Sequence, residues 1–100
     1  MRIAVTDVGR TFGRQTRAYA EYRIFSSLAR FSGIVCDATL SLTPSPAGRH
    51  TVRCRVTVSL GHGSDLCISA QGEHAYDAIN KAARRMFDAL QQHSGVALSS

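Results

Sequence analysis

The sequence predicts an α+β domain: a two-layer sandwich in which two helices cover one face of a four-stranded, mostly antiparallel sheet. Apolar residues recur with a period of two in residues 50–60 and with a helical period in residues 72–92. The predicted elements follow the order β-α-β-β-β-α, and both helices need a sheet face to cover. One hundred residues suffice for a single core.

Four strands are expected, at residues 2–8, 34–43, 50–60 and 66–71. In residues 50–60 every second residue is apolar, which predicts one buried face and one wet face. The apolar set is Val52, Cys54, Val56, Val58 and Leu60. Residues 44–48 and 61–65 are rich in proline, glycine and polar residues and should form the two turns of an antiparallel meander. The first strand should join the meander through a right-handed helical crossover.

The first helix is expected over residues 17–31, with Thr16 as its N-cap. The spacing places Ala18, Tyr22, Phe25, Leu28 and Ala29 on the core-facing side, with Ile24 at its margin. The opposite, outer face should then carry Tyr19, Arg23, Ser26, Ser27 and Arg30. Arg23 and Arg30 are seven residues apart and should lie almost above one another along the helix.

The second helix is expected over residues 72–92. Its wide apolar stripe comprises Ala75, Ile79, Ala82, Ala83, Met86 and Leu90. Lys81, Arg84 and Arg85 lie near its middle, away from the C-terminal turn where helix electrostatics favour cations. We expect residues 1–93 to form the single domain and residues 94–100 a short C-terminal tail.

The composition points to a polyanion as partner. Twelve basic residues against seven acidic ones give a net charge of +5, and Lys81 is the sole lysine among them. Arginine presents a planar fork of donors that suits phosphate. Three scattered cysteines predict reduced thiols and no disulfide, as in a cytoplasmic protein. The chain lacks a long apolar run and a hydrophobic leader, so we expect it to be soluble, neither exported nor bound to a membrane.

Nothing in the sequence predicts catalysis, a metal or a cofactor. The four histidines lack the short spacing of a metal site. There is no glycine-rich phosphate loop, no paired catalytic carboxylates and no nucleophile elbow. Cys67 is expected on the polar face of the sheet and is the one candidate for a reactive thiol, so a small thiol- or metal-dependent enzyme using Cys67 is a further alternative.

Several stretches nevertheless resemble a known family. They are residues 17–23 (RAYAEYR), 28–31 (LARF), 53–56 (RCRV) and 75–83 (AYDAINKAA). Their order and content resemble the ribosome hibernation-promoting factor or ribosome-associated inhibitor family, also called the sigma-54 modulation group, and its compact single-domain members in particular. The resemblance covers nearly the whole chain. It implies binding to the small ribosomal subunit and ribosomal RNA, and repression of translation under stress or in stationary phase.

The resemblance also implies that basic residues on the helices and the sheet rim bind RNA. We therefore predict an RNA-binding surface made of Arg17, Tyr19, Arg23, Arg30, Lys81, Arg84 and Arg85, with Arg10 and Arg14 flanking its end. After Arg85 the chain ends without the basic tail usual in that family, which predicts fewer phosphate contacts. The alternative is a module of the same fold that binds another protein, or forms a homodimer, through a free sheet edge.

Overall fold

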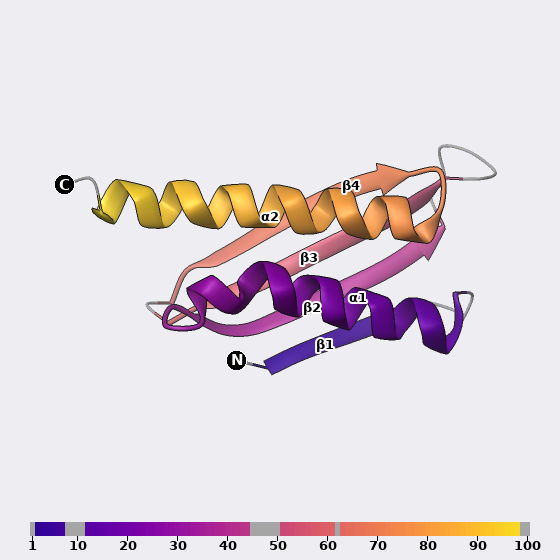
Figure 1. Cartoon of the computed structure of the whole chain (residues 1–100), viewed down its shortest axis with the longest axis horizontal. Helices are drawn as coiled ribbons and strands as arrows, with labels where there is room; N and C mark the ends of the chain where they lie inside the picture. Colours follow the sequence, from indigo (N-terminus) through magenta and orange to yellow (C-terminus); the bar gives the residue numbers. More distant parts are fainter. Residues whose placement is uncertain (1, 8–11, 45–50, 62, 99–100) are drawn as a thin grey trace.

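The computed structural model describes residues 2–7, 12–44, 51–61 and 63–98. The elements, in chain order, are β1 (Arg2–Asp7), α1 (Gly13–Leu28), the short 3₁₀ helix η2 (Ala29–Phe31), β2 (Val35–Pro44), β3 (Val52–Leu60), β4 (Asp65–Gly72) and α2 (Ala75–Leu98). The four strands form one sheet in the order β1-β2-β3-β4. Both helices lie on the same side of it, with α1 beside β1 and α2 beside β3 and β4 (Figure 1). The predicted two-layer α+β fold is confirmed.

The register of the sheet explains how one apolar face forms. β1 runs parallel to β2, and β2, β3 and β4 form the predicted antiparallel meander. One row across the sheet pairs Val5 with Leu40, Leu40 with Val56 and Val56 with Ile68. Because side chains alternate along each strand, this row and its neighbours at every second residue face the helices.

The core lies between that sheet face and the apolar stripe of α2. All six stripe residues predicted for the second helix are buried, and so are all five apolar residues predicted for the strand over 50–60. Arg53 and Arg55, which alternate with them, are exposed on the open face of the sheet, as the period-two pattern requires.

The first helix differs from its prediction in where it begins. α1 starts at Gly13, four residues before the predicted start at Arg17. Thr16 is a buried residue inside the helix, so its assignment as the N-cap was wrong. Residues 13–16 carry no apolar spacing that would reveal a helical turn, and the glycine favoured a loop reading.

The buried face of α1 also differs from its prediction. Tyr22 and Phe25, which were expected in the core, expose 61% and 57% of their surface. Ala18 and Ala29, placed on the same face, are exposed as well. The residues that α1 buries are Thr16, Ala20, Ile24, Ser27 and Leu28. Of the predicted face, only Leu28 and the marginal Ile24 reach the core, because the helix is rotated relative to the expected orientation.

This rotation is possible because a serine serves as a small core residue. Ser27 is only 6% exposed, and its hydroxyl donates a hydrogen bond of 2.9 Å to the carbonyl oxygen of Arg23 in its own helix. A buried hydroxyl that is bonded within its helix avoids most of the cost of losing water. The two large aromatic residues therefore lie at the outer rim of α1.

Several element ends also shift. β2 includes Pro44, which was assigned to the following loop, and β3 begins at Val52 rather than at residue 50. α2 continues to Leu98, past the predicted end at Gln92. The remainder of the predicted 44–48 loop, together with His50 and His62, lies outside the described residues. None of the helices in the described part of the chain is long and apolar enough to span a membrane.

Candidate nucleic-acid interface

The start of α2 sets the direction in which its side chains point. The amide of Glu73, just before the helix, donates to the Asp77 carboxylate at 3.1 Å. The amide of Asp77, in the first turn, donates to Nδ1 of His74 at 3.3 Å, so one free amide of that turn is satisfied. The Glu73 amide, and after it Lys81, hold the pKa of Asp77 below its usual value. Gly72 makes the tight entry possible, because a Cβ on it would lie 2.6 Å from the amide nitrogen of Ala78.

A hydrogen-bonded network joins the two helices. Oδ1 of Asn80 on α2 accepts the Tyr19 hydroxyl at 2.7 Å and Nε of Arg23 at 2.9 Å, both from α1. Nη1 of Arg23 also donates to the Ser27 hydroxyl at 3.1 Å. The Tyr19 ring meets the Tyr76 ring edge-on, with 4.6 Å between centroids. Tyr19 and Arg23 therefore lie half-buried between the helices, and their predicted place on an outer face was wrong.

Beside this network is a hollow of about 340 Å³, which we call the interhelical hollow. It is lined by Arg23, Ser26, Ser27, Arg84 and Phe87. The guanidinium carbon of Arg30 lies 5.9 Å from the Phe87 ring centroid, within cation–π range. Three of the predicted RNA-binding residues thus meet here: Arg23 and Arg84 line the hollow, and Arg30 lies against its aromatic wall.

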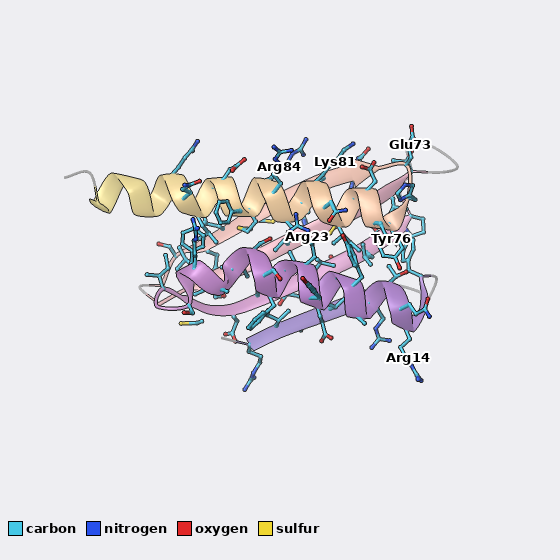
Figure 2. The ribbon with its side chains drawn as sticks, in the orientation of Figure 1. Arg14, Arg23, Glu73, Tyr76, Lys81 and Arg84 are labelled. Atoms are coloured by element: carbon cyan, nitrogen blue, oxygen red, sulfur yellow. The ribbon has the colours of Figure 1, made fainter. Side chains whose placement is uncertain are left out.

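Lys81 and Arg85, the other two predicted RNA-binding residues of α2, point toward the edge of the sheet. Nζ of Lys81 lies 3.4 Å from the Asp77 carboxylate and 3.4 Å from the backbone oxygen of Gln71. Nη1 of Arg85 donates to the backbone oxygen of Ser69 at 2.8 Å. The two backbone acceptors, Gln71 and Ser69, belong to β4, which is an edge strand. Lys81 projects from the side of α2 that faces away from α1, whereas Arg23 lies between the helices (Figure 2).

The remaining predicted residue, Arg17, belongs to neither group. It is exposed near the beginning of α1. Arg14, one turn earlier, is also exposed and points away from α2 (Figure 2). Arg10 lies outside the described residues. The predicted single surface is therefore a central arginine group at the interhelical hollow, with cations toward the β4 edge and others at the start of α1.

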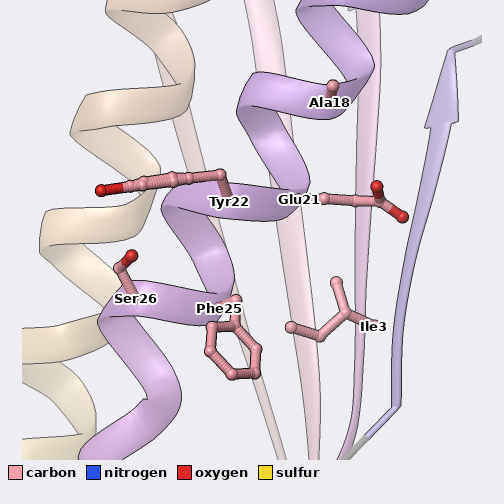
Figure 3. Close-up of a pocket in the computed structure, with 6 residues that line it drawn as sticks. All are labelled: Ile3, Ala18, Glu21, Tyr22, Phe25 and Ser26. Carbon is pink, nitrogen blue, oxygen red and sulfur yellow. The ribbon is translucent and has the colours of Figure 1, made fainter.

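A second, more apolar hollow of about 600 Å³ lies between α1 and the edge strand β1. Ile3 of β1 and Phe25 of α1 face one another across it, and Tyr22 and Ala18 line it farther along the helix (Figure 3). Sequence reasoning missed this hollow because it assigned Tyr22 and Phe25 to the core. Glu21 is the one acidic residue among those that line it.

The thiols and histidines do not assemble a reactive centre in the described residues. All three cysteines are free, as predicted, and Cys36 and Cys67 are exposed whereas Cys54 is buried. Burial raises the pKa of the Cys54 thiol to about 12, so it stays protonated at neutral pH. No group of three or more histidine, cysteine, aspartate or glutamate side chains in the described part of the chain is placed to hold a metal ion.

The fold and the helical layer define a class of protein: a small, basic α+β domain with several arginines on its helices. The sequence profile of the family described as "Sigma 54 modulation protein / S30EA ribosomal protein" matches residues 3–95, and the chain belongs to that family. No curated protein sequence is significantly similar to it.

Solved structures show the same fold at low sequence identity. A ribosomal subunit interface protein from Coxiella burnetii superposes with a TM-score of 0.78 at 14% identity, over 95% of this chain and 99% of that one. The N-terminal domain of Thermus thermophilus Protein Y superposes with a TM-score of 0.75 at 18% identity, over 93% of this chain and 99% of that one.

Proposed function

We propose that this protein binds the small ribosomal subunit through ribosomal RNA and represses translation, without catalysing a reaction. The chain belongs to a family whose description names a ribosomal protein, and its fold is similar to that of a ribosomal subunit interface protein. Both findings support ribosome association. The single observation that carries the proposal is the arginine group at the interhelical hollow, where Arg23, Arg30 and Arg84 meet on the exposed helical layer.

The chemistry of that group suits phosphate more than base edges. Guanidinium groups donate in pairs to phosphate oxygens, and phosphate contacts fix a protein on RNA without reading its sequence. Binding should therefore be poorly sequence-specific and should weaken steeply with salt, because counterions are released from the RNA. A folded domain bound in the channel through which messenger and transfer RNA pass would then block translation.

The test is co-sedimentation with purified small subunits at low and at moderate salt. The wild type should pellet at low salt and be released as salt rises. Replacing Arg84 and Arg85 with alanine should loosen binding and lower the salt slope by about one unit for each lost phosphate contact. A wild type that stays in the supernatant at low salt would show that the ribosome proposal is wrong.

The structure favours a second candidate, pairing with a second copy through the β1 edge. β1 has one strand neighbour, and its inward-facing Ile3 and Val5 are only half-buried. Tyr22 and Phe25 are exposed above it. At the opposite edge, Lys81 and Arg85 already occupy backbone acceptors of β4, which discourages strand addition there. This candidate predicts concentration-dependent dimers with weak salt dependence that Phe25→Ser abolishes, as measured by sedimentation equilibrium.

A further inference from the structure

We infer that Asn80 is a positioning residue that makes Arg23 a phosphate ligand in the interhelical hollow, because it fixes the guanidinium without cancelling its charge. The inference rests on the proposed function, since it names one phosphate contact of the same helical face. The ligand chemistry is a phosphate group, carried either by an RNA backbone or by a free anion.

The first step is the count of donors on Arg23. A guanidinium has five N–H donors in a fixed plane. Nε donates to Asn80 and one N–H of Nη1 donates to Ser27, at 2.9 Å and 3.1 Å. The other three N–H groups make no hydrogen bond within the described part of the chain. Because Arg23 lines the hollow while two of its donors are held by the helices, the fork is preorganised and free donors remain for a ligand.

The second step is the charge of the acceptor. Oδ1 of Asn80 accepts two hydrogen bonds, from Tyr19 and from Arg23, and the amide carries no charge. A carboxylate in the same place would accept the same two hydrogen bonds but would neutralise the guanidinium. No acidic side chain is among the residues that line the hollow. The positive charge of Arg23 is thus left for a partner from outside.

The third step is the second cation. Arg84 lines the same hollow from α2 and forms no ion pair with the described residues. Arginines from both helices therefore border the hollow, and a guanidinium fork suits phosphate oxygens better than a flexible lysine does. The Phe87 ring forms an apolar wall against which a sugar or a base of the ligand could pack.

The experiment compares two amide-to-acid substitutions of nearly identical shape. Asn80→Asp places a carboxylate beside Arg23, whereas Gln91→Glu places one at an exposed position of α2 outside the hollow. Each lowers the net charge by one, from +5 to +4. We expect Asn80→Asp to weaken co-sedimentation with small subunits about ten-fold at moderate salt, because a hydrogen-bonded charge contact is lost. Its salt slope should fall by about one unit.

The control Gln91→Glu should bind within about two-fold of the wild type, because charge repulsion at an exposed site is weak. The melting temperature of Asn80→Asp should not fall, since its carboxylate still accepts from Tyr19 and Arg23. A merely structural asparagine predicts the opposite pattern, with stability lost and the salt slope kept. Equal losses of binding in the two variants would mean that net charge alone matters, and would overturn the inference.

A second measurement, on the wild type, needs neither ribosomes nor a folded variant. The Arg23 Nε–H resonance is followed by NMR at constant ionic strength, with inorganic phosphate in one arm and a short oligouridylate in the other. A shift with inorganic phosphate assigns a free-anion site, and a shift with the oligonucleotide alone assigns a backbone phosphate. Either result supports the inference even if small subunits fail to bind, and no shift in either arm overturns it.

Discussion

Arg84 and Arg85 are adjacent, carry the same charge and are expected to behave differently when each is replaced by alanine. They project from α2 about 100° apart. Arg84 lines the interhelical hollow, whereas Arg85 donates to the Ser69 carbonyl of β4 at 2.8 Å. Arg84→Ala should therefore weaken small-subunit binding about ten-fold and lower its salt slope by about one unit, while changing stability by less than about 0.5 kcal/mol.

Arg85→Ala should show the reverse balance. Losing the hydrogen bond to Ser69 should cost about 1 kcal/mol, which in a domain of this size lowers Tm by about 4–8 °C. Its effect on binding should be the smaller of the two, because the guanidinium is already engaged at the sheet edge. Co-sedimentation across a salt series and thermal melts by circular dichroism measure both quantities. Arg55→Ala, on the open sheet face, is the control for loss of one positive charge. Equal binding losses for Arg84→Ala and Arg85→Ala would refute this division of roles.

Three further predictions concern the fold and its ionisable groups. In urea titrations, Ile24→Ala should lower the free energy of unfolding by about 2–5 kcal/mol, because this side chain is fully buried. Phe25→Ala should lower it by less than about 1 kcal/mol, because Phe25 is exposed. The reverse order would mean that Phe25, as the sequence predicted, faces the core. In the native protein the exposed thiols of Cys36 and Cys67 should react with a disulfide reagent. Cys54 should react only after unfolding, because burial blocks access to its thiol and raises its pKa to about 12. Three thiols that react quickly in the native protein would contradict this prediction. The pKa of Asp77 is lowered in the folded protein, so its carboxylate adds stability above about pH 4, the usual pKa of an unfolded aspartate. This contribution is lost as pH falls through the folded pKa, so the stability difference between wild type and Asp77→Asn should shrink in that range. A difference that stays constant with pH would contradict the assignment.

The layers, the antiparallel meander and the core of the last helix could be predicted from the sequence because their patterns are strong. The strand over 52–60 alternates without a break, and α2 has an apolar stripe wide enough to fix its rotation. The first helix has no such stripe. Its aromatic residues suggested one face, but Ser27 and Thr16 are small polar residues that the core accepts, and only tertiary packing decides between the two faces.

The candidate site was predicted as a set of residues but not as an arrangement. A helical wheel can say that Arg23 and Arg84 lie off the apolar stripe. It cannot say that Arg23 points toward the neighbouring helix, because that depends on the separation of the helices and on an acceptor more than fifty residues away in the sequence. Asn80 was not predicted as a functional residue, because its role depends on hydrogen bonds to Tyr19 and Arg23 of the other helix that the sequence does not reveal. The apolar hollow beside β1 was missed because its aromatic residues were assigned to the core.

The network at Asn80 joins residues far apart in the chain, and this has a consequence for the order in which the protein is made. Tyr19 and Arg23 are 61 and 57 residues before their common acceptor. Synthesis releases the N-terminal helix first, and contacts of large sequence separation form after local ones. A chain that has emerged only through β4 carries Arg23 but has neither the amide that orients it nor Arg84 and Phe87. The interhelical hollow is therefore completed by α2, so the proposed ribosome-binding site exists only after that helix has been made and has packed against α1.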